Sequence, residues 1–295
     1  MKIYNFGSLN IDYTYHVEHI SCEGETISSI QRTISPGGKG LNQTVALARA
    51  GADVVHVGHI GQEDGKFLLD FLNSVGICTS NISSVEGASG HAIIQVDNNG
   101  QNSIILFAGA NSTITKADVD SVLSGAKAGD WLLLQNEITE VGYIIEKGHA
   151  LGLKVFFNAA PFSKEVLSFS LDKLECLIVN EIEAMGIAEV DESTCIEAVI
   201  DRLEKKYPNV DILVTIGEKG SILISNGSRI HQDAFIVDVV DTTGAGDTFV
   251  GYYLSTISKG KTAEEALRIA SKASSVMISR QGAAPTIPYI SEITI

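Results

Sequence analysis

Short apolar runs recur along the chain with few polar interruptions. They are rich in Val, Ile and Leu, and they lie at residues 2–6, 54–60, 131–134, 154–157, 177–179 and 212–216. Continuous rather than alternating apolarity is typical of strands that are buried on both faces. The pattern therefore predicts a mostly parallel sheet that is covered on both sides.

Between these runs, apolar residues recur at helical spacing. The predicted helices span residues 39–50, 63–75, 116–123, 141–151, 194–206, 246–258 and 263–279. Several are followed by a glycine that ends the helix. Strands that alternate with helices predict an α/β fold with a doubly wound, mostly parallel sheet. We expect one domain over residues 1–295.

Two segments depart from this alternation. Residues 11–36 alternate in polarity without a helical period, and residues 91–107 have the pattern of a hairpin around a turn at 97–100. Together they predict a small antiparallel sheet that grows out of the α/β body. Such a sheet is either a lid over a binding site or a plain extension of the main sheet.

The charge balance narrows the range of partners. The chain has 36 acidic and 21 basic residues, a net charge of −15, and no cluster of five or more Lys and Arg residues. This balance argues against nucleic acid and against an anionic membrane as partners. An anionic ligand such as a phosphate therefore requires local backbone donors, a few placed cations or a metal.

The cysteines and the N-terminus indicate a cellular location. Cys22, Cys78, Cys176 and Cys195 lie far apart and form no C-x-x-C motif, which favours reduced thiols in a cytosol. The first residues contain no unbroken apolar stretch typical of a signal peptide. We expect a soluble, cytoplasmic protein.

A glycine-rich segment at residues 241–247 precedes one of the predicted helices. The backbone N–H groups of Gly244, Ala245 and Gly246 would form an anion hole at the helix N-terminus. The carboxylate of Asp247 is placed to accept a proton from an attacking hydroxyl. The alternative is an ordinary helix start, in which the helix dipole favours an acidic residue.

A second glycine-rich segment, residues 37–43, opens an earlier helix. It departs from the Walker pattern because Gly40 follows Lys39 where Ser or Thr is required. Lys39 and Asn42 share one side of the first helical turn, which suits a polyhydroxylated ligand. The alternative, a glycine-rich entry to a core helix, leaves Lys39 unexplained.

Asn180 and Glu183 follow the apolar run at 177–179. Their spacing places both on one helical face at the carboxyl edge of the sheet, where open α/β folds bind ligands. Hard oxygen ligands at this edge suit hydrated Mg²⁺. The alternative is an ordinary helix cap.

The two glycine-rich motifs, in this order, resemble the two signatures of the PfkB-type carbohydrate kinases, and within that family the ribokinase branch. The resemblance runs from residues 7–12 to residues 282–288, almost the whole chain. Further segments agree at residues 24–26, 108–111, 135–137, 158–161, 180–183 and 215–220. The family often has Pro where Ala159 stands, and its histidine near the adenine is replaced around Ser271 or Lys272.

The resemblance implies a ribokinase-like fold and assigns roles by position. Asp247 is then the base, and Gly244–Gly246 form the anion hole. The implied sugar contacts are Asn10, Asp12, Gly38, Lys39, Asn42 and Glu137. Asn180 and Glu183 organise Mg²⁺ near the phosphates, while Thr215, Gly217 and Gly220 line the nucleotide site. The implied K⁺ site consists of Asp241, Thr243, Met277, Arg280, Gly282 and Thr286.

The expected function is transfer of a phosphoryl group from ATP to the 5-hydroxyl of D-ribose beneath the lid. Two carboxylates with neutral donors fit an uncharged polyol better than a sugar phosphate. The alternatives are a kinase of deoxyribose, another sugar or a nucleoside, and a sugar-sensing protein without catalysis. The presence of Asp247 argues against the last. The family resemblance also implies a homodimer formed through the β lid.

Overall fold

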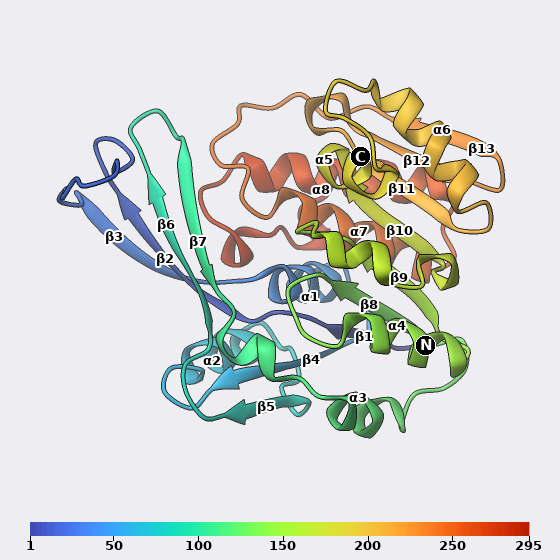
Figure 1. Ribbon diagram of the computed structural model, residues 1–295, viewed down its shortest axis with the longest axis horizontal. Coiled ribbons are helices and arrows are strands. Elements are labelled where there is room, and N and C mark those ends of the chain that lie inside the picture. Colours follow the sequence, from blue (N-terminus) through green and yellow to red (C-terminus); the bar gives the residue numbers. More distant parts are fainter. Residues whose placement is uncertain (295) are drawn as a thin grey trace.

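The main sheet of the computed structural model, which describes residues 1–294, has nine strands in the order β13-β12-β11-β10-β9-β8-β1-β4-β5 (Figure 1). Pairing is parallel from β11 to β5, and β12 and β13 are antiparallel additions. The predicted α/β class with a mostly parallel sheet is therefore confirmed. The strands are β1 Ile3–Phe6, β4 Val54–Gly61, β5 Ile82–Val85, β8 Trp131–Gln135, β9 Lys154–Asn158, β10 Cys176–Asn180, β11 Asp211–Thr215, β12 Ser221–Ser225 and β13 Ser228–Gln232.

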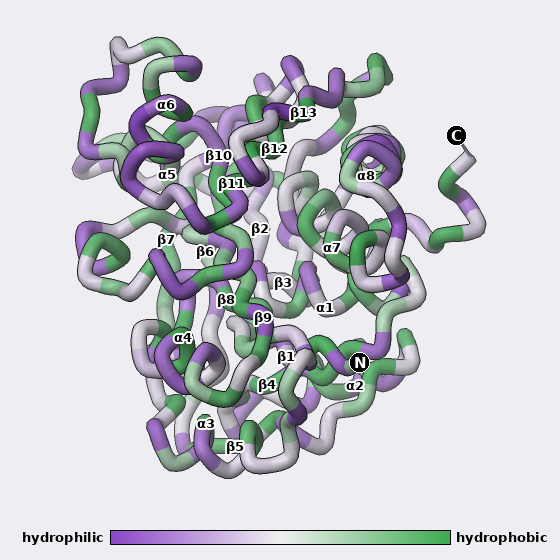
Figure 2. The backbone as a smooth tube through the Cα atoms, turned by 90° about the vertical axis from the view of Figure 1, so that its right-hand side faces the viewer, coloured by the Kyte–Doolittle hydropathy of each residue, from purple (hydrophilic) through white to green (hydrophobic). Residues whose placement is uncertain are grey.

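Helices cover both faces of this sheet. Leu41, Leu254 and Leu267 belong to one buried apolar cluster, whereas Val119 and Ile144 belong to a second. In Figure 2 the tube of α7 is largely hydrophobic and that of the peripheral α6 largely hydrophilic. The helices are α1 Lys39–Arg49, α2 Lys66–Ser74, α3 Lys116–Leu123, α4 Val141–Ala150, α5 Glu181–Ala188, α6 Ile196–Lys206, α7 Ala245–Ser258 and α8 Ala263–Ile278.

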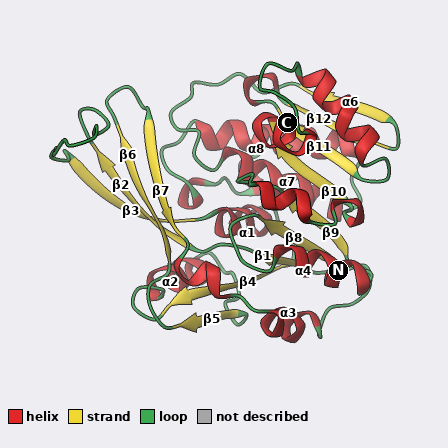
Figure 3. Ribbon diagram, in the orientation of Figure 1, coloured by secondary structure: helices red, strands yellow, loops and turns green. Residues whose placement is uncertain are grey.

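A second sheet projects from the body as strands joined by loops (Figure 3). It has the order β3-β2-β6-β7, with β2 Asn10–His16, β3 Gln31–Gly37, β6 Gly90–Val96 and β7 Asn102–Phe107. The two expected segments thus do form one small sheet. Its central pair, β2 with β6, is parallel, so the expectation of an antiparallel sheet is wrong at this point. The reason is that β2 follows β1 and β6 follows β5, and β1 and β5 both run parallel to β4 in the main sheet.

The sequence pattern did not predict the short polar strand β5, the hairpin of β12 and β13, or the full extent of α5. The hairpin turns at Asn226 and Gly227, which both have positive φ, 50° and 72°. Within residues 1–294, no helix has both the length and the apolar character needed to cross a bilayer.

Candidate active site

The first turns of α1 and α7 meet at Asp247. Its side chain is 7% exposed, and each carboxylate oxygen accepts one hydrogen bond from α1. Asn42 Nδ2 donates to Oδ2 at 2.9 Å, and Gln43 Nε2 donates to Oδ1 at 2.9 Å. The two glycine-rich motifs therefore form a single site, with the carboxylate held by two amides.

Helix α7 begins at a glycine for a conformational reason. Gly244 has φ of 77°, a left-handed conformation that disfavours side chains. Of the three N–H groups expected in the anion hole, that of Ala245 donates to Thr242 O at 3.2 Å. Within residues 1–294, the N–H groups of Gly244 and Gly246, and that of Asp247, which was not among the three expected, have no backbone acceptor. These three donors at a helix N-terminus are therefore available to an anion.

A cavity of about 460 Å³ adjoins the start of α7. The three residues expected at the nucleotide site line it, together with one of the two expected Mg²⁺ residues and two of the anion-hole residues: Thr215, Gly217, Gly220, Asn180, Ala245 and Gly246. Phe235 and Phe249 add aromatic walls that the sequence did not predict. The Lys272 ammonium lies 5.1 Å from the centre of the Phe235 ring. Ser271, one of the two positions at which the family's histidine is expected to be replaced, lines the same cavity.

A second cavity, of about 330 Å³, lies between the small sheet and the loop that follows β8. Asn10 and Glu137, two of the expected sugar contacts, line it. Asn111, which the sequence analysis gave no role, fixes Asn10 by donating from Nδ2 to its Oδ1 at 2.7 Å. The apolar part of the lining consists of Leu106, Phe107, Ala108, Ile138 and Pro161.

Glu137 and Lys39 connect this second cavity to Asp247. Glu137 Oε2 accepts from Ser8 Oγ at 2.5 Å and from the Lys39 backbone N–H at 3.0 Å. Burial raises the pKa of Glu137, although the Lys39 charge opposes this. The carboxylate of Asp247, and then those of Glu137 and Glu183, raise the pKa of Lys39 despite its burial. Lys39 therefore keeps its positive charge in the field of these three carboxyl groups.

Asp12, on β2, lies against the Gly37 backbone. A Cβ atom at Gly37 would lie 2.0 Å from Asp12 Oδ2, so only glycine leaves room for this carboxyl. Burial, together with the charges of Glu137 and Asp247, raises the pKa of Asp12 to about 7. Ligand hydroxyls that donate hydrogen bonds to the Asp12 carboxylate would stabilise its charged form, which burial disfavours.

Asn180 and Glu183 form a reciprocal cap at the start of α5. Asn180 Oδ1 accepts from the Glu183 N–H, and Glu183 Oε2 accepts from the Asn180 N–H, both at 2.9 Å. The ordinary capping role therefore exists. These two residues also fit a role in holding Mg²⁺, because their oxygens are hard donors and Asn180 lines the larger cavity. The charge of Glu183 helps to raise the pKa of Lys39, so this end of α5 is electrostatically coupled to the rest of the site.

Five of the six expected cation residues lie on two segments that are bonded to each other, one before α7 and one after α8, and the sixth, Met277, lies in the last turn of α8. Asp241 Oδ1 accepts from the Thr243 N–H at 2.9 Å, and Oδ2 accepts from the Gly282 N–H at 3.0 Å. Thr286 Oγ1 lies 3.4 Å from Met277 Sδ and 3.0 Å from Gly282 O. Among residues 1–294, no three His, Cys, Asp or Glu side chains are grouped as for a metal ion. One carboxylate with several carbonyls fits a monovalent cation better than a divalent one.

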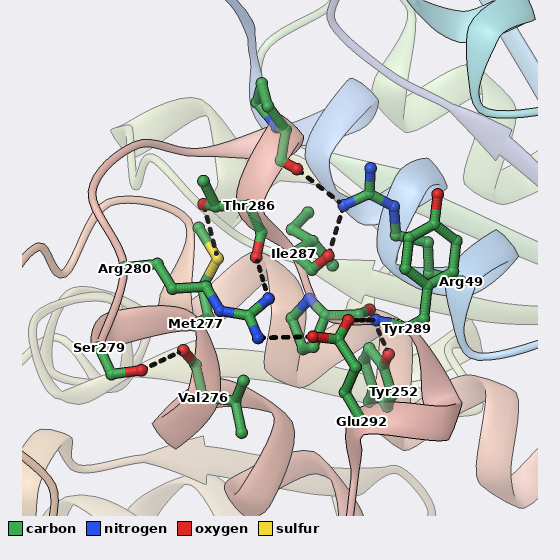
Figure 4. A network of polar contacts seen from close by, with 12 residues as sticks. Arg49, Tyr252, Val276, Met277, Ser279, Arg280, Thr286, Ile287, Tyr289 and Glu292 are labelled. Carbon is green, nitrogen blue, oxygen red and sulfur yellow. Dashed lines mark hydrogen bonds and ion pairs between the residues drawn. The ribbon is translucent and has the colours of Figure 1, made fainter.

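Charged side chains fasten the second of these loops to the body (Figure 4). Arg280 donates to Thr286 O at 3.2 Å and pairs with Glu292 at 2.6 Å. The buried Arg49, at the end of α1, donates to the carbonyls of Ala284, Pro285 and Ile287, and its guanidinium lies 4.7 Å from the Tyr289 ring centre. Helix α1, whose first turn contacts Asp247, thus ends against the segment that holds Gly282 and Thr286.

Comparisons with known proteins agree with this geometry. Residues 2–289 match the family described as pfkB family carbohydrate kinase. The ribokinase of Haemophilus influenzae is 33% identical over 292 residues, which cover 96% of this chain and 94% of that one. The deoxyribokinase of Salmonella typhi is 31% identical over 298 residues, covering 99% and 97%. The structure of Arabidopsis thaliana ribokinase complexed with ribose and ATP superposes with a TM-score of 0.85 at 29% identity, covering 99% and 96%.

The family match extends over both helix starts that meet at Asp247 and over the loops of the expected cation site. Two curated relatives exceed 30% identity across nearly their full length. The resemblance inferred from the sequence is therefore confirmed. The chain belongs to the pfkB family of carbohydrate kinases.

Proposed function

We propose that this carbohydrate kinase transfers the γ-phosphoryl group of ATP to the 5-hydroxyl of D-ribose. The observation that carries the proposal is the place of Asp247. It is buried at the start of α7, directly after Gly246, which lines the larger cavity. Through Asn42 and Lys39 it is connected to Glu137, which lines the smaller cavity. A buried carboxylate that directly follows a residue lining the larger cavity, and that is linked through α1 to the smaller one, is suited to take the proton of a phosphoryl acceptor.

The proposed reaction assigns a role to each part of the site. Asp247 accepts the proton of the sugar hydroxyl while that oxygen bonds to the γ-phosphorus and the bond from this phosphorus to the bridging oxygen of ADP breaks. The free N–H groups of Gly246 and Asp247 stabilise the charge of the transferring group. Mg²⁺, when bound with the nucleotide, neutralises phosphate charge, and Asn180 and Glu183 are the residues that would hold it or its waters.

The sugar contacts in this proposal are Asn10, Asp12, Gly38, Lys39, Asn42 and Glu137. They offer carboxylates, amides and one cation, and that cation is already surrounded by Asp247, Glu137 and Glu183. A sugar phosphate would meet several carboxylates and no free cation among these residues. The set therefore favours an uncharged polyol. K⁺ bound at the loops of Asp241 and Gly282 would stabilise the backbone conformation of the anion hole.

The small sheet is proposed as the lid and as the dimer contact. Its register aligns Ile34, Tyr13, Ile93 and Ile105 in a row that crosses all four strands. Asp12 is one residue away along β2, so its side chain points to the opposite face. The row faces away from the Asp12 side, and its three isoleucines are 39% to 63% exposed. An exposed apolar row of this kind favours a homodimer.

A cytoplasmic location belongs to the same proposal. Cys22, Cys78, Cys176 and Cys195 are all free thiols, which supports a reducing compartment. We further propose that residues 1–295 act as one kinase domain with its lid at 11–36 and 91–107.

A second substrate class has an observation in its favour. Leu106, Phe107, Ile138 and Pro161 give the smaller cavity an apolar side that a bare pentose does not require. Such a surface suits a nucleoside base or the missing hydroxyl of deoxyribose. Coupled assays with ribose, 2-deoxyribose, fructose and adenosine decide between them. Ribose is expected to have the highest kcat/KM, and a higher value for adenosine would contradict the proposal.

Discrimination against 2-deoxyribose is expected to depend on Asp12. A buried polar group left without its hydroxyl partner costs about 1–3 kcal/mol, which corresponds to roughly 5- to 150-fold in kcat/KM. Asp12→Ala should therefore slow ribose turnover much more than deoxyribose turnover. Equal slowing of both sugars would show that Asp12 does not contact the 2-hydroxyl.

A further inference from the structure

Gln43 is a fully buried side chain whose amide is engaged at both ends. Its Nε2 donates to Asp247 Oδ1 and to Asn158 Oδ1, both at 2.9 Å. Its Oε1 accepts from Gln135 Nε2 at 2.7 Å. The proposed reaction does not assign a role to Gln43, yet it is one of the two side chains that bind the carboxylate of Asp247.

The contacts extend through a second amide into the body of the sheet. Gln135 Nε2 also donates to Asn5 Oδ1 at 2.9 Å. Asn5 Nδ2 donates to Gly40 O at 2.9 Å and to Thr44 Oγ1 at 2.8 Å, which fixes the orientation of Asn5. Asn5, Gln43 and Gln135 are 0% exposed, so water does not compete for these bonds. The chain of amides joins β1, β8 and α1.

This chain permits only one orientation of the Gln43 amide. A rotated amide would place Oε1 against Asp247 Oδ1 and Asn158 Oδ1, and Nε2 against the Gln135 donor. Two contacts between acceptors and one between donors are costly in a buried place. The orientation of Gln135 is fixed even though its own Oε1 has no partner within residues 1–294. The bonding therefore directs an N–H group at Asp247.

We propose that Gln43 is a positioning residue for Asp247, and that Gln135 maintains the Gln43 amide in its active orientation. Asn42 and Gln43 each bind one carboxylate oxygen, so the group cannot rotate without breaking two hydrogen bonds. Each oxygen keeps a further lone pair that can take up a proton. The inference rests on the proposed role of Asp247 as the base.

The test compares Gln43→Met with a control outside the chain of amides, Ser255→Ala in α7. Gln43→Met keeps the length of the side chain but removes the donor to Asp247, and a hydrogen bond to a charged group predicts a fall in kcat of about 10- to 100-fold. KM for sugar and ATP should change by no more than about threefold, because the bond is not made to substrate. Ser255→Ala also removes a buried hydrogen bond, from Ser255 Oγ to Ala50 O at 3.0 Å, but it should lower thermal stability without lowering kcat.

A pH profile separates positioning from loss of structure. Loss of a donor to a carboxylate disfavours its charged form, so the acid limb of kcat should move to higher pH in Gln43→Met. The charged groups that act on Asp247 are Lys39 from α1, Asp12 from β2, Glu137 from the loop after β8 and Glu183 from α5. They are the same in both variants. An equal shift in Ser255→Ala would overturn the positioning role.

Gln135→Met provides an independent variant in case Gln43→Met does not fold. It leaves Gln43 in place but frees its amide to rotate, so a smaller fall in kcat of about three- to tenfold is expected. If Asp247→Asn abolishes turnover while both glutamine variants keep wild-type kcat and pH profile, the positioning role is wrong. If Asp247→Asn itself retains turnover, the proposed function of Asp247 fails instead.

Discussion

Asn42 Nδ2 lies 2.9 Å from Asp247 Oδ2, although 205 positions separate the two residues. The contact joins the first turns of α1 and α7, and each helix follows a glycine-rich segment. Lys39, one turn from Asn42, is held in its charged form chiefly by Asp247. Two motifs distant in the sequence therefore make one electrostatic unit.

Sugar affinity is expected to depend on pH through Asp12. Its pKa is raised to about 7 by burial and by two nearby carboxylates, so the group is largely protonated below pH 6. Sugar hydroxyls donate to the charged form, and KM for ribose should therefore fall as pH rises from 6 to 8. Steady-state kinetics across this range test the prediction. In Asp12→Asn, KM is expected to be higher and nearly independent of pH.

The same group affects stability in the opposite direction. Between about pH 4 and pH 7 the folded protein keeps the Asp12 proton that the unfolded chain has lost. The contribution of Asp12 to stability is therefore lost as pH rises through this window. Asp12→Asn should raise Tm at pH 8 by a few degrees and have little effect at pH 4. A lower Tm for the variant at pH 8 would show that the charged Asp12 carboxylate is stabilised by its surroundings, which would contradict the prediction.

Most of the fold follows from the pattern of apolar residues. Runs such as residues 131–134 and 154–157 predicted buried parallel strands, and these are β8 and β9. The hairpin of β12 and β13 was missed although Asn226 and Gly227 form a recognisable turn signal. The parallel pairing of β2 with β6 was not predictable, because alternation within a strand does not identify its partner.

The site divides in the same manner. The sequence singles out Asp247, Lys39 and Asn42 as candidates because a charged or amide group beside glycines at a helix start is unusual. Gln43 lies in the same motif but resembles an ordinary helical residue, and only the fold shows its bond to Asp247. No sequence pattern around Phe235 indicates that it lines the cavity, because it lies in a loop of irregular structure.

Activity is expected to rise far more with K⁺ than with Na⁺. The loops of Asp241 and Gly282 offer a carboxylate and carbonyls, and such sites distinguish the two ions by size and field strength. Arg49→Lys removes the multiple contacts with the carbonyls of Ala284, Pro285 and Ile287. The variant should need more K⁺ for half-maximal activity.

The control for Arg49 is Arg229→Lys. Arg229 is an exposed arginine that pairs with Asp201 and Glu204 at the far edge of the sheet. Its substitution should leave the K⁺ response unchanged. Equal rates in potassium and sodium buffers of the same ionic strength would rule out the monovalent site.

Association of two chains through the small sheet is tested by Ile105→Lys. Ile105 is 63% exposed in the row with Ile93, Tyr13 and Ile34, and a charge in this row should dissociate a dimer. Sedimentation velocity should show a shift from dimer to monomer. Leu151→Lys, at a 38% exposed leucine after α4, is the matched control and should remain dimeric. A wild type that is monomeric at all concentrations would refute the contact.

The turnover of Asp247→Asn measures how far catalysis depends on Asp247 as the base. The amide has nearly the same shape as the carboxylate and can still bind Asn42 or Gln43, but it cannot accept the proton of the sugar hydroxyl. We predict that ribose and ATP bind with nearly unchanged affinity by calorimetry, while kcat falls by about 10²- to 10⁴-fold, the usual effect of losing a positioned base. A variant that binds both ligands and keeps more than half of the wild-type turnover would contradict the account.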